Sequence, residues 1–434
     1  MNSISNNLKS IFLSAIESVK PQNFIPEKIA YYENMLIIEN SRYNLSKYKN
    51  IYIIGFGKAS SAMSVELEKI LGDKITGGLI LTKYGHTDYK SKIKTLESSH
   101  PLPDDKCIEN TKALLEYLKK TVENDLILVL VSGGGSALLE QPEENIFLND
   151  LINLNSSLLK CGVSIFEINY LRKFISKVKG GQLLNYIYPA DFITLIISDV
   201  VGDPPETIAS GPTIPQALNS SECRRIIEKY ELNQKLPSNI ASYISSTKEK
   251  STLNLKSYNT HILMSNIFAL KQAEKTALSL GFNTLILSSK FEGDTTDLAS
   301  FLFSIAEEIN SNEIPLKKPA CIISGGETTV KINGNGKGGR NQEFVLAFIN
   351  KLYKKNIKNI AVASIGTDGT DGPTDAAGAF WNCDNFEKNN VLLENADFYL
   401  QNNDSYNFFE LANALVKTGP TGTNVMDVRI IIIT

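Results

Sequence analysis

The fold class follows from a stretch that reads Ile51-Tyr52-Ile53-Ile54-Gly55-Phe56-Gly57-Lys58-Ala59-Ser60. Four consecutive apolar residues indicate a strand that is buried on both faces, and the glycines mark the turn that ends it. A helical pattern then runs from Lys58 to about Leu71. Because buried strands that alternate with helices are typical of sheets covered by helices, this stretch predicts an α/β fold with mostly parallel strands.

The same order of strand, turn and helix recurs along the chain. An amphipathic helix is expected near the N-terminus, where apolar residues recur with helical spacing between Leu8 and Val19. A polar stretch at about 219–258 lacks glycine and is predicted to be a short helix and an inter-domain connection. We therefore predict two α/β domains, residues 1–235 and 236–434. The other predicted strands are Gly78–Leu81, Leu126–Val131, Phe192–Ile197, His261–Met264, Thr284–Leu287, Ala320–Ile323, Ile360–Ala363 and Arg429–Ile433.

The composition argues against several kinds of partner. The 434 residues carry a net charge of −3, so no overall basic field would attract nucleic acid or an anionic membrane surface. No run approaches the ~18 uninterrupted apolar residues of a membrane span, and the N-terminus lacks the pattern of a secretory signal. The five cysteines are widely spaced, which favours reduced side chains over a metal site. We expect a cytoplasmic monomer or homodimer without nucleic-acid or membrane partners.

Two turns that follow strands in the N-terminal half suit an anion. Lys58 adds a full charge to the backbone N–H groups of a helix start, although a solvated lysine in a first helical turn would look the same. The surrounding sequence is not a Walker A loop, because Ala59 stands where that loop has a hydroxyl group. The second turn, Ser132-Gly133-Gly134-Gly135-Ser136, has three consecutive glycines that let the backbone wrap an anion closely. A purely structural turn is the alternative.

Carboxylates follow other predicted strands. Asp199 and Asp203 lie four residues apart, and such a pair can hold Mg²⁺ or orient a substrate hydroxyl group, although either residue can instead cap a helix. Glu327 and Asp368 are the alternate acidic residues. The segment Gly366–Asp375 around Asp368 has some of the alternation of a calcium loop, but it lacks an acidic residue at a ligand position. We expect this segment to face the nucleotide or the substrate.

The stretch with the densest chemistry reads Gly334-Asn335-Gly336-Lys337-Gly338-Gly339-Arg340-Asn341-Gln342-Glu343. Its glycines satisfy GxGxxG after a predicted strand at Thr328–Ile332, which supports a dinucleotide site. Polar residues at the helix start oppose that interpretation, and no acidic residue ends a strand about 20 positions later. The guanidinium of Arg340 at the helix entrance suits a phosphoryl group better, because it binds two oxygens at once.

Taken in order, these motifs resemble the class II glycerate kinase (glycerate 2-kinase) family over essentially the whole chain. The similarity also includes the segments Ser99–Asp104, Ser198–Thr213 and Thr418–Asn424. That family combines a Rossmann-like N-terminal domain, a parallel sheet flanked by helices, with a C-terminal α/β domain called MOFRL. The resemblance implies ATP, a divalent cation, D-glycerate as substrate and 2-phosphoglycerate as product, with Lys58 and Arg340 as the matching catalytic pair.

Two positions depart from the pattern of that family. Its Lys-Gly-Gly-Arg run appears as Lys179–Gln182, which removes a positive charge, and its Arg-Lys-His run appears as Arg172–Phe174. These departures concern nearby anion contacts more than the class of reaction.

On this basis we expect phosphoryl transfer from MgATP in a cleft between the two α/β domains. Lys58 and Arg340 are assigned to the transferring phosphoryl group and the glycerate carboxylate, with Asp368 as a further substrate contact. Asp199 is the candidate for Mg²⁺ or for orienting the attacking hydroxyl group, and Glu327 is a second candidate metal ligand. The nucleotide phosphates are assigned to Ser132, Gly133, Gly134, Gly135, Ser136, Gly336, Gly338, Gly339 and Asn341.

Two alternatives stay open at this point. An NAD(P)-dependent hydroxypyruvate reductase, a label that relatives in this family have carried, requires the loop Gly334–Gly339 to bind a dinucleotide. A regulatory protein that binds a sugar acid is the non-enzymatic alternative. The sequence shows neither a helix-turn-helix pattern nor a basic patch to support it.

Overall fold

The computed structural model describes residues 4–87, 90–251, 253 and 259–434. The chain forms two compact units. The N-terminal unit comprises Ile25–Ser198 and Asp203–Leu263, and the C-terminal unit comprises Met264–Thr434 together with Met1–Phe24 and Asp199–Gly202. Each unit is built around its own six-stranded sheet, in agreement with the predicted pair of α/β domains.

The sheet of the N-terminal unit has the strand order β11-β8-β7-β4-β5-β6. Pairing is parallel between β4 and both β5 and β7, between β5 and β6, and between β7 and β8. Every residue of β7 is buried, which explains the apolar run from Leu126 to Val131 after its first residue, Asp125. This is the Rossmann-like parallel sheet that the resemblance implied. The strands are β4 (Asn50–Phe56), β5 (Ile75–Lys83), β6 (Lys94–Ser98), β7 (Asp125–Val131), β8 (Asp191–Ile197) and β11 (Thr260–Met264).

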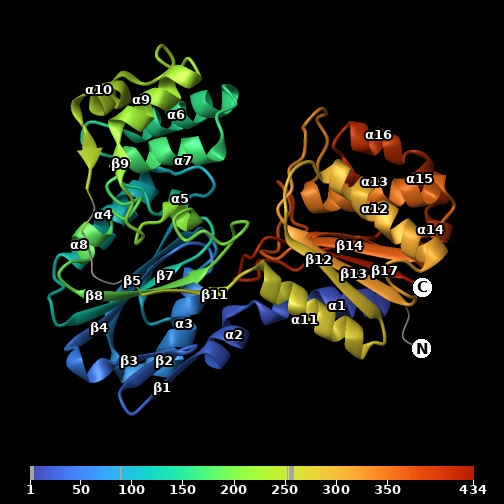
Figure 1. Ribbon diagram of the computed structural model, residues 1–434, viewed down its shortest axis with the longest axis horizontal. Helices are drawn as coiled ribbons and strands as arrows, with labels where there is room; N and C mark the ends of the chain where they lie inside the picture. Colours follow the sequence, from blue (N-terminus) through green and yellow to red (C-terminus); the bar gives the residue numbers. More distant parts are fainter. Residues whose placement is uncertain (1–3, 88–89, 252, 254–258) are drawn as a thin grey trace. The chain divides into compact units, whose positions relative to one another are not determined.

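Helices and a small second sheet surround these strands (Figure 1). α3 (Ser60–Leu71) packs against β4, β5 and β7, whereas α4 (Asp105–Leu118) packs against β5 and β6. The small sheet is antiparallel and has the order β1-β2-β3. The remaining short elements are α2 (Pro21–Lys28), β1 (Ile29–Tyr32), β2 (Met35–Ile38), β3 (Ser41–Asn44), α5 (Gly135–Leu138) and α8 (Leu184–Ile187).

A helical lobe extends the N-terminal unit (Figure 1). It consists of α6 (Leu148–Lys160), α7 (Ile165–Phe174), α9 (Ser220–Lys229) and α10 (Ser238–Ser246), which share one buried apolar core. The prediction of an inter-domain connection at about 219–258 was therefore wrong. Each helix of this stretch has a single narrow apolar face, for example Ile226 and Ile227 on α9, so its composition looked too polar for a core.

The boundary between the units also differs from 235/236. The strand predicted at His261–Met264 is β11, the edge strand of the N-terminal sheet, and not the first strand of the second domain.

A short two-stranded pair, β9 (Leu218–Asn219) and β10 (Glu249–Lys250), lies on either side of α9 and α10 in sequence. The helix predicted near the N-terminus is α1 (Ile4–Ser18), and it belongs to the C-terminal unit.

The sheet of the C-terminal unit has the order β12-β13-β17-β14-β15-β16 and is mixed rather than mostly parallel. β12 and β13 are parallel, but β17 pairs antiparallel with both β13 and β14. The last strand of the chain thus enters the middle of the sheet. The strands are β12 (Asn283–Phe291), β13 (Ala320–Gly326), β14 (Ile360–Gly366), β15 (Gly378–Trp381), β16 (Leu415–Val416) and β17 (Asp427–Ile433).

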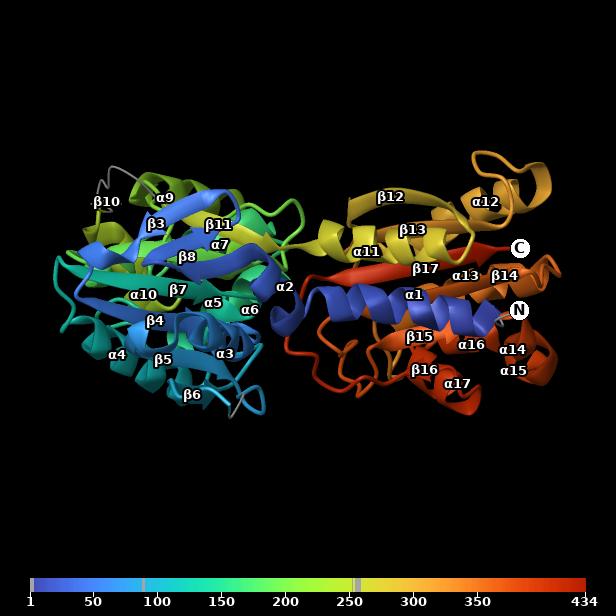
Figure 2. The same ribbon diagram turned by 90° about the horizontal axis from the view of Figure 1, so that it is seen from below.

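Helices cover both faces of this sheet (Figures 1 and 2). One face carries α1 and α11 (Asn266–Ser279), which pack along each other, and the other carries α12 (Thr295–Asn312) and α13 (Arg340–Lys354). α1 buries its apolar residues, including Ile11, Phe12 and Ala15. Four short helices complete the unit: α14 (Cys383–Lys388), α15 (Asn390–Glu394), α16 (Ala396–Gln401) and α17 (Ser405–Leu411).

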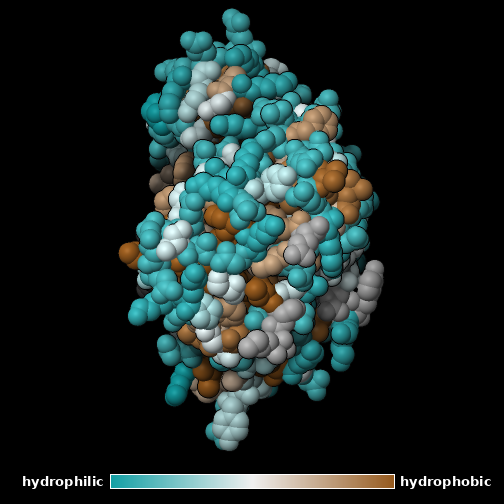
Figure 3. Space-filling model, turned by 90° about the vertical axis from the view of Figure 1, so that its right-hand side faces the viewer, coloured by the Kyte–Doolittle hydropathy of each residue, from teal (hydrophilic) through white to brown (hydrophobic). Residues whose placement is uncertain are grey.

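The surface and the cysteines agree with the composition. Hydrophilic residues cover most of the face seen in Figure 3, and hydrophobic ones form small separate groups. Within the described ranges, no helix is both long enough and apolar enough to cross a bilayer. The cysteines are all free thiols, namely Cys107, Cys161, Cys223, Cys321 and Cys383.

Candidate active site

The loop after β4 and the loop after β7 lie together at one edge of the N-terminal sheet. The Lys58 amide donates to the Gly133 carbonyl at 2.9 Å, and the Ala59 amide donates to Ser132 Oγ at 3.0 Å. Gly57 has a φ of +127°, and a Cβ there would collide with Ser132, so only glycine fits this approach. β4 and β7 are adjacent parallel strands, and their carboxyl ends therefore bring the two predicted anion loops together.

The loop Ser132–Ser136 also lies beside His100 and beside Ser210. A Cβ on Gly134 would lie 3.0 Å from the His100 ring and 3.4 Å from Lys58 Cγ. Ser136 Oγ and Ser210 Oγ are hydrogen-bonded at 2.8 Å. His100 was noticed in the sequence only as part of the resemblance, and it thus lies beside Lys58. Its place could not be inferred from spacing, because it is contributed by the loop after β6.

The N-terminus of α3, directly after Lys58, has no side-chain cap. The N-cap residue is Ala59, which has no polar side-chain atom to accept a hydrogen bond from the first helical turn. The positive end of the helix dipole and the Lys58 ammonium group therefore add together at this edge. This combination suits a phosphate group.

The two residues that depart from the family pattern, Gln182 and Phe174, are both buried in the N-terminal unit, and Gln182 Nε2 donates to the Ser251 carbonyl at 3.4 Å. Lys179 is fully buried and pairs with Glu140, and burial lowers its pKa to about 8. Phe174 is buried in the core of the helical lobe. Lys173 donates to the Glu206 carbonyl at 2.8 Å. These residues support neighbouring loops through contacts within the protein.

In the C-terminal unit the register of the sheet collects the predicted site residues at one edge. Asp427, the first residue of β17, lies opposite both Gly326 and Gly366, the last residues of β13 and β14. The segments that follow β13 and β14 carry Glu327 and Asp368. The carboxyl ends of two parallel strands and the amino end of the strand between them therefore meet there.

Arg340 joins this edge through its ion pairs. Its Nε donates to Asp427 Oδ2 at 2.7 Å and its Nη2 to Asp427 Oδ1 at 3.0 Å. Its Nη1 lies 2.7 Å from Glu327 Oε1. Burial alone would lower the pKa of Arg340, but the Asp427 and Glu327 carboxylates reverse this effect and raise the pKa above its ordinary value. The guanidinium is therefore a permanent cation at the entrance of α13.

The backbone donors of the same helix start are already paired. The amides of Asn341 and Gln342 donate to the two carboxylate oxygens of Asp371 at 3.0 and 2.9 Å. Asp371 is buried, which raises its pKa to about 6. These two amides are therefore engaged by a carboxylate of the protein itself.

Asn341, predicted to bind the nucleotide, is fully buried. Its Nδ2 donates to Asp427 Oδ1 at 2.9 Å, and its Oδ1 accepts from Ser364 at 2.6 Å. The side chain of this second residue of α13 is thus engaged by residues of β14 and β17 rather than exposed to a ligand. Asn341 connects the helix to Asp427.

The glycines of the GxGxxG stretch are explained by packing against neighbouring turns. A Cβ would collide with Asn402 and Asp404 at Gly336, with Ser405 at Gly338, and with Asp371 at Gly339. The predicted strand at Thr328–Ile332 is not formed; Thr329 makes only an isolated bridge to Asp294. A dinucleotide fingerprint needs that strand, so the stretch lacks the context of a Rossmann phosphate loop.

The other candidate carboxylates neighbour Glu327. Asp199 belongs to the C-terminal unit, where Asn424 Nδ2 donates to its Oδ2 at 3.4 Å. Asp368 accepts from the amide and hydroxyl of Thr370, both at 3.0 Å. In the part of the chain that the structure describes, no group of three His, Cys, Asp or Glu side chains is arranged to hold a metal ion.

Glu327 has an unusual acidity for a carboxyl group. Burial is the main cause that raises its pKa to about 7; Arg340 opposes this, and Asp427, Asp199 and Asp368 add to it. Burial and the neighbouring carboxylates raise the pKa of Glu327 by more than the ion pair with Arg340 lowers it. The Glu327 side chain is 43% exposed. A carboxyl group near neutral pKa can accept a proton from a substrate hydroxyl group and release it again.

We expect Glu327→Gln to remove a pH-dependent loss of stability. The pKa is raised from 4.5 to about 7 in the folded state, so the group favours folding fully below about 4.5 and loses this contribution as the pH rises through 7. The melting temperature of the variant minus that of the wild type should therefore increase between pH 4.5 and 7 and then level off. Calorimetry at pH 5, 6, 7 and 8 measures this difference. Glu307→Gln, which removes a surface ion pair with Lys355, is the control. A difference in melting temperature that stays constant from pH 5 to pH 8 for Glu327→Gln would contradict the raised pKa of Glu327.

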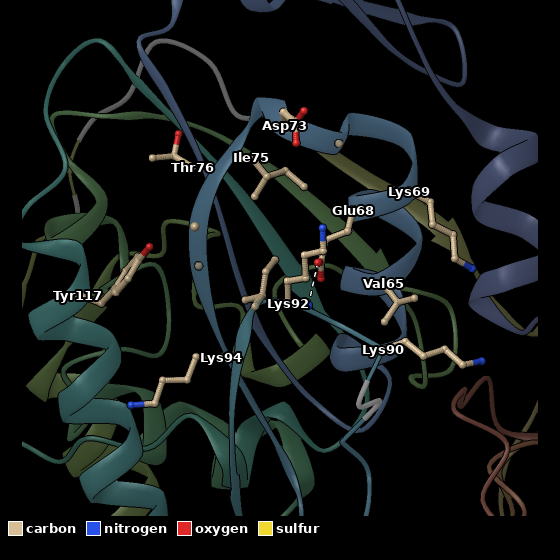
Figure 4. A pocket seen from close by; sticks show the side chains of 14 residues that line it. Val65, Glu68, Lys69, Asp73, Ile75, Thr76, Lys90, Lys92, Lys94 and Tyr117 are labelled. Atoms are coloured by element: carbon tan, nitrogen blue, oxygen red, sulfur yellow. Dashed lines mark hydrogen bonds between the residues drawn. The ribbon is translucent and has the colours of Figure 1, made fainter.

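A cavity of about 690 Å³ lies elsewhere in the N-terminal unit (Figure 4). It is lined by the start of β5, the end of α3 and the segment before β6, and the Lys92 amide donates to Glu68 across it at 2.8 Å. These are the amino ends of the strands. Lys58 and Ser132–Ser136 lie at the carboxyl ends and do not line this cavity. The cavity is therefore distinct from the predicted site.

Comparison with known proteins gives matches over the whole chain. Residues 7–245 match the family described as "Domain of unknown function (DUF4147)", and residues 320–427 match the MOFRL family. A D-glycerate 2-kinase of Thermotoga maritima is 37% identical over 421 residues, which cover 97% of this chain and 96% of the relative. A protein of Agrobacterium vitis with the provisional name hydroxypyruvate reductase is 36% identical over 88% of this chain and 98% of its own length. A crystal structure of a Thermotoga maritima glycerate kinase superposes with a TM-score of 0.86 at 36% identity, covering 100% of both chains.

Proposed function

The chain belongs to the glycerate kinase family with a C-terminal MOFRL domain, and from this premise we propose that it transfers the γ-phosphoryl group of ATP to the 2-hydroxyl group of D-glycerate. The observation that carries the proposal is the match over the full length of both units. A D-glycerate 2-kinase and a glycerate kinase structure each cover at least 96% of this chain and of their own length.

Lys58 and Arg340 are proposed as the cations that act on the reacting groups. Phosphoryl transfer depends on positioning and on neutralising the charge of the phosphoryl oxygens, which two cations supply. Lys58 stands before an uncapped helix start, and Arg340 is held by carboxylates with part of its side chain exposed.

Ser132–Ser136 is proposed to hold nucleotide phosphates. The loop lies against the backbone of Lys58, so a phosphate at the loop would lie within reach of the ammonium group. Gly336, Gly338 and Gly339 were predicted to share this task. Packing against Asn402–Ser405 and Asp371 accounts for these glycines without a nucleotide, and we leave them out of the proposal.

Mg²⁺ is proposed to enter with ATP rather than to occupy a site made of protein alone. Mg²⁺ is usually held by one or two carboxylates together with the phosphates of its nucleotide. Asp199 is the proposed carboxylate ligand, and both Asp199 and Asp368 lie close enough to Glu327 to raise its pKa. When bound, the metal would neutralise charge on the phosphates.

Asp199→Asn is expected to weaken the dependence of the rate on Mg²⁺, because an amide binds this cation less well than a carboxylate. The concentration of Mg²⁺ that gives half-maximal rate should rise, and a titration at saturating ATP measures it. Asp375→Asn is the matched control, since Asp375 is exposed and pairs with Lys417 at 2.9 Å. An unchanged midpoint for Asp199→Asn would move the metal ligand to Glu327 or Asp368.

The competing reaction is NAD(P)H-dependent reduction of hydroxypyruvate, which one relative's provisional name suggests. A coupled assay separates the two: ADP should appear only when D-glycerate, ATP and Mg²⁺ are all present. NADH consumption with hydroxypyruvate at a matching or greater rate would overturn the kinase proposal. A cytoplasmic location and a monomeric or homodimeric state stay predictions.

A further inference from the structure

Asp427 anchors Arg340 along one edge of the guanidinium, and no motif in the sequence had singled it out. Its two carboxylate oxygens accept from Nε and Nη2 of Arg340 at 2.7 and 3.0 Å, which makes a two-pronged pair. Asp427 begins β17, between the ends of β13 and β14. The centre of the sheet therefore fixes the plane of the guanidinium.

The Asp427 carboxylate is fully buried, and residues other than Arg340 also donate hydrogen bonds to it. Arg429, also fully buried, donates from Nη2 to Asp427 Oδ2 at 3.1 Å and to Thr328 Oγ1 at 3.1 Å. Asn341 donates to the other oxygen of Asp427 at 2.9 Å. A buried carboxylate without such partners would be strongly destabilising. Arg340, Asp427 and Arg429 thus form one chain of alternating charges.

This anchor leaves part of the Arg340 guanidinium available to a ligand. A guanidinium has five N–H donors. Asp427 takes two of them, through Nε and Nη2, and Nη1 lies 2.7 Å from Glu327 Oε1 in an ion pair. A second donor on Nη2 and a donor on Nη1 are not bonded to Asp427, and 30% of the side chain is exposed. Two such donors match two oxygens of a phosphoryl group or a carboxylate.

We propose that Asp427 is a positioning residue, which orients Arg340 so that these two donors face the anionic groups of the substrates, and that Arg429 holds Asp427 in place. Asp427 itself is too deeply buried to touch a substrate. This inference rests on the proposed function, because it takes Arg340 as a catalytic residue.

The central test is Asp427→Asn, which keeps the shape of the side chain but loses its charge and one acceptor. We expect kcat for glycerate phosphorylation to fall about 10²-fold, since a displacement of about 1 Å can cost that much. In an Arg340→Ala background the same substitution should change kcat by no more than about 2-fold, because no guanidinium remains to be oriented. Equal losses in both backgrounds would indicate a structural role only and overturn the inference.

Two further variants protect this test from a folding defect. Asp427→Asn/Arg429→Met removes the buried cation together with its partner, and should be impaired like Asp427→Asn with its circular dichroism retained. Asp397→Asn is the matched control, because Asp397 pairs with Lys354 at 2.7 Å near the other end of α13, at an exposed position. It should leave kcat unchanged. Wild-type rates for Asp427→Asn/Arg429→Met would overturn the inference.

A spectroscopic measurement separates failure of this inference from failure of the proposed function. The chain has six arginines, so the Nε–Hε signal of Arg340 can be identified by its loss in Arg340→Ala. We expect a slowly exchanging signal in the wild type that is shifted or lost in Asp427→Asn and retained in Asp397→Asn. If the wild type lacks glycerate-dependent ATP turnover, the proposed function fails while this signal still reports the anchor. An unchanged signal in Asp427→Asn overturns the inference.

Discussion

Arg340→Ala is expected to lower kcat by about 10²–10⁵-fold, the range spanned when a donor to a developing oxyanion or the arginine of a phosphoryl transfer is removed. The loss should fall on kcat more than on KM, because the charge on the phosphoryl oxygens is redistributed in the transition state. Arg340→Lys should also be strongly impaired. An ammonium group keeps the charge but loses the planar, two-pronged contact with Asp427 that fixes the orientation of the cation.

The matched control for Arg340 is Arg225→Ala. Arg225 is half exposed and pairs with Glu222 and Glu167 on the surface of the helical lobe, so its loss should leave kcat within about 2-fold of wild type. Steady-state rates at saturating ATP and D-glycerate give the comparison, with folding checked by circular dichroism. A folded Arg340→Ala variant within a few-fold of the wild-type rate would remove Arg340 from the catalytic machinery.

Lys58→Ala should produce a loss of comparable size. The Lys58 amide donates to the Gly133 carbonyl and so fixes the position of the loop Ser132–Ser136 beside this residue. Since alanine keeps this amide, the substitution removes the charge without removing the backbone contact. The expected fall in kcat is again about 10²–10⁵-fold. The Michaelis constant for ATP should change less if the charge acts mainly in the transition state.

Lys92→Ala and Lys94→Ala are the matched controls for this experiment. Both lysines belong to the same unit but line the cavity at the opposite ends of the strands (Figure 4). Removing either charge changes the net charge of the unit by the same amount as Lys58→Ala. If these controls lose as much activity as Lys58→Ala, a general electrostatic effect explains the result and the specific role of Lys58 is wrong.

The sequence predicted most of the long buried strands, because such strands leave apolar runs, but it missed β6, β15 and β16. β4, β7, β8, β13, β14 and β17 all lie where such runs occur, extended by one to three residues at their ends. The gathering of Lys58 with Ser132–Ser136 was also predictable, because the carboxyl ends of parallel strands share one edge. Local sequence patterns therefore predicted these buried strands and the meeting of these two loops.

What the sequence could not predict depends on contacts between distant segments. Asp371 lies 30 residues after Asn341, and only the folded chain brings its carboxylate to the start of α13. Asp427 lies 87 residues after Arg340 and looks like an ordinary residue before an apolar strand. The antiparallel insertion of β17 was equally hidden, since an apolar run does not reveal its direction. The carboxylates of Asp371 and Asp427 therefore accept from the donors at the start of α13, where the sequence had suggested a phosphate group.

The most direct test of the account is to incubate the protein with D-glycerate, ATP and Mg²⁺ and to record the proton-coupled ³¹P NMR spectrum of the product. Phosphate on the 2-hydroxyl group is coupled to a single methine proton, so the account predicts a doublet that appears together with ADP and only when D-glycerate is present. A triplet, from phosphate on the 3-hydroxyl group, would contradict the proposed position of transfer. Absence of any glycerate-dependent product, with NADH consumed by hydroxypyruvate, would contradict the kinase itself.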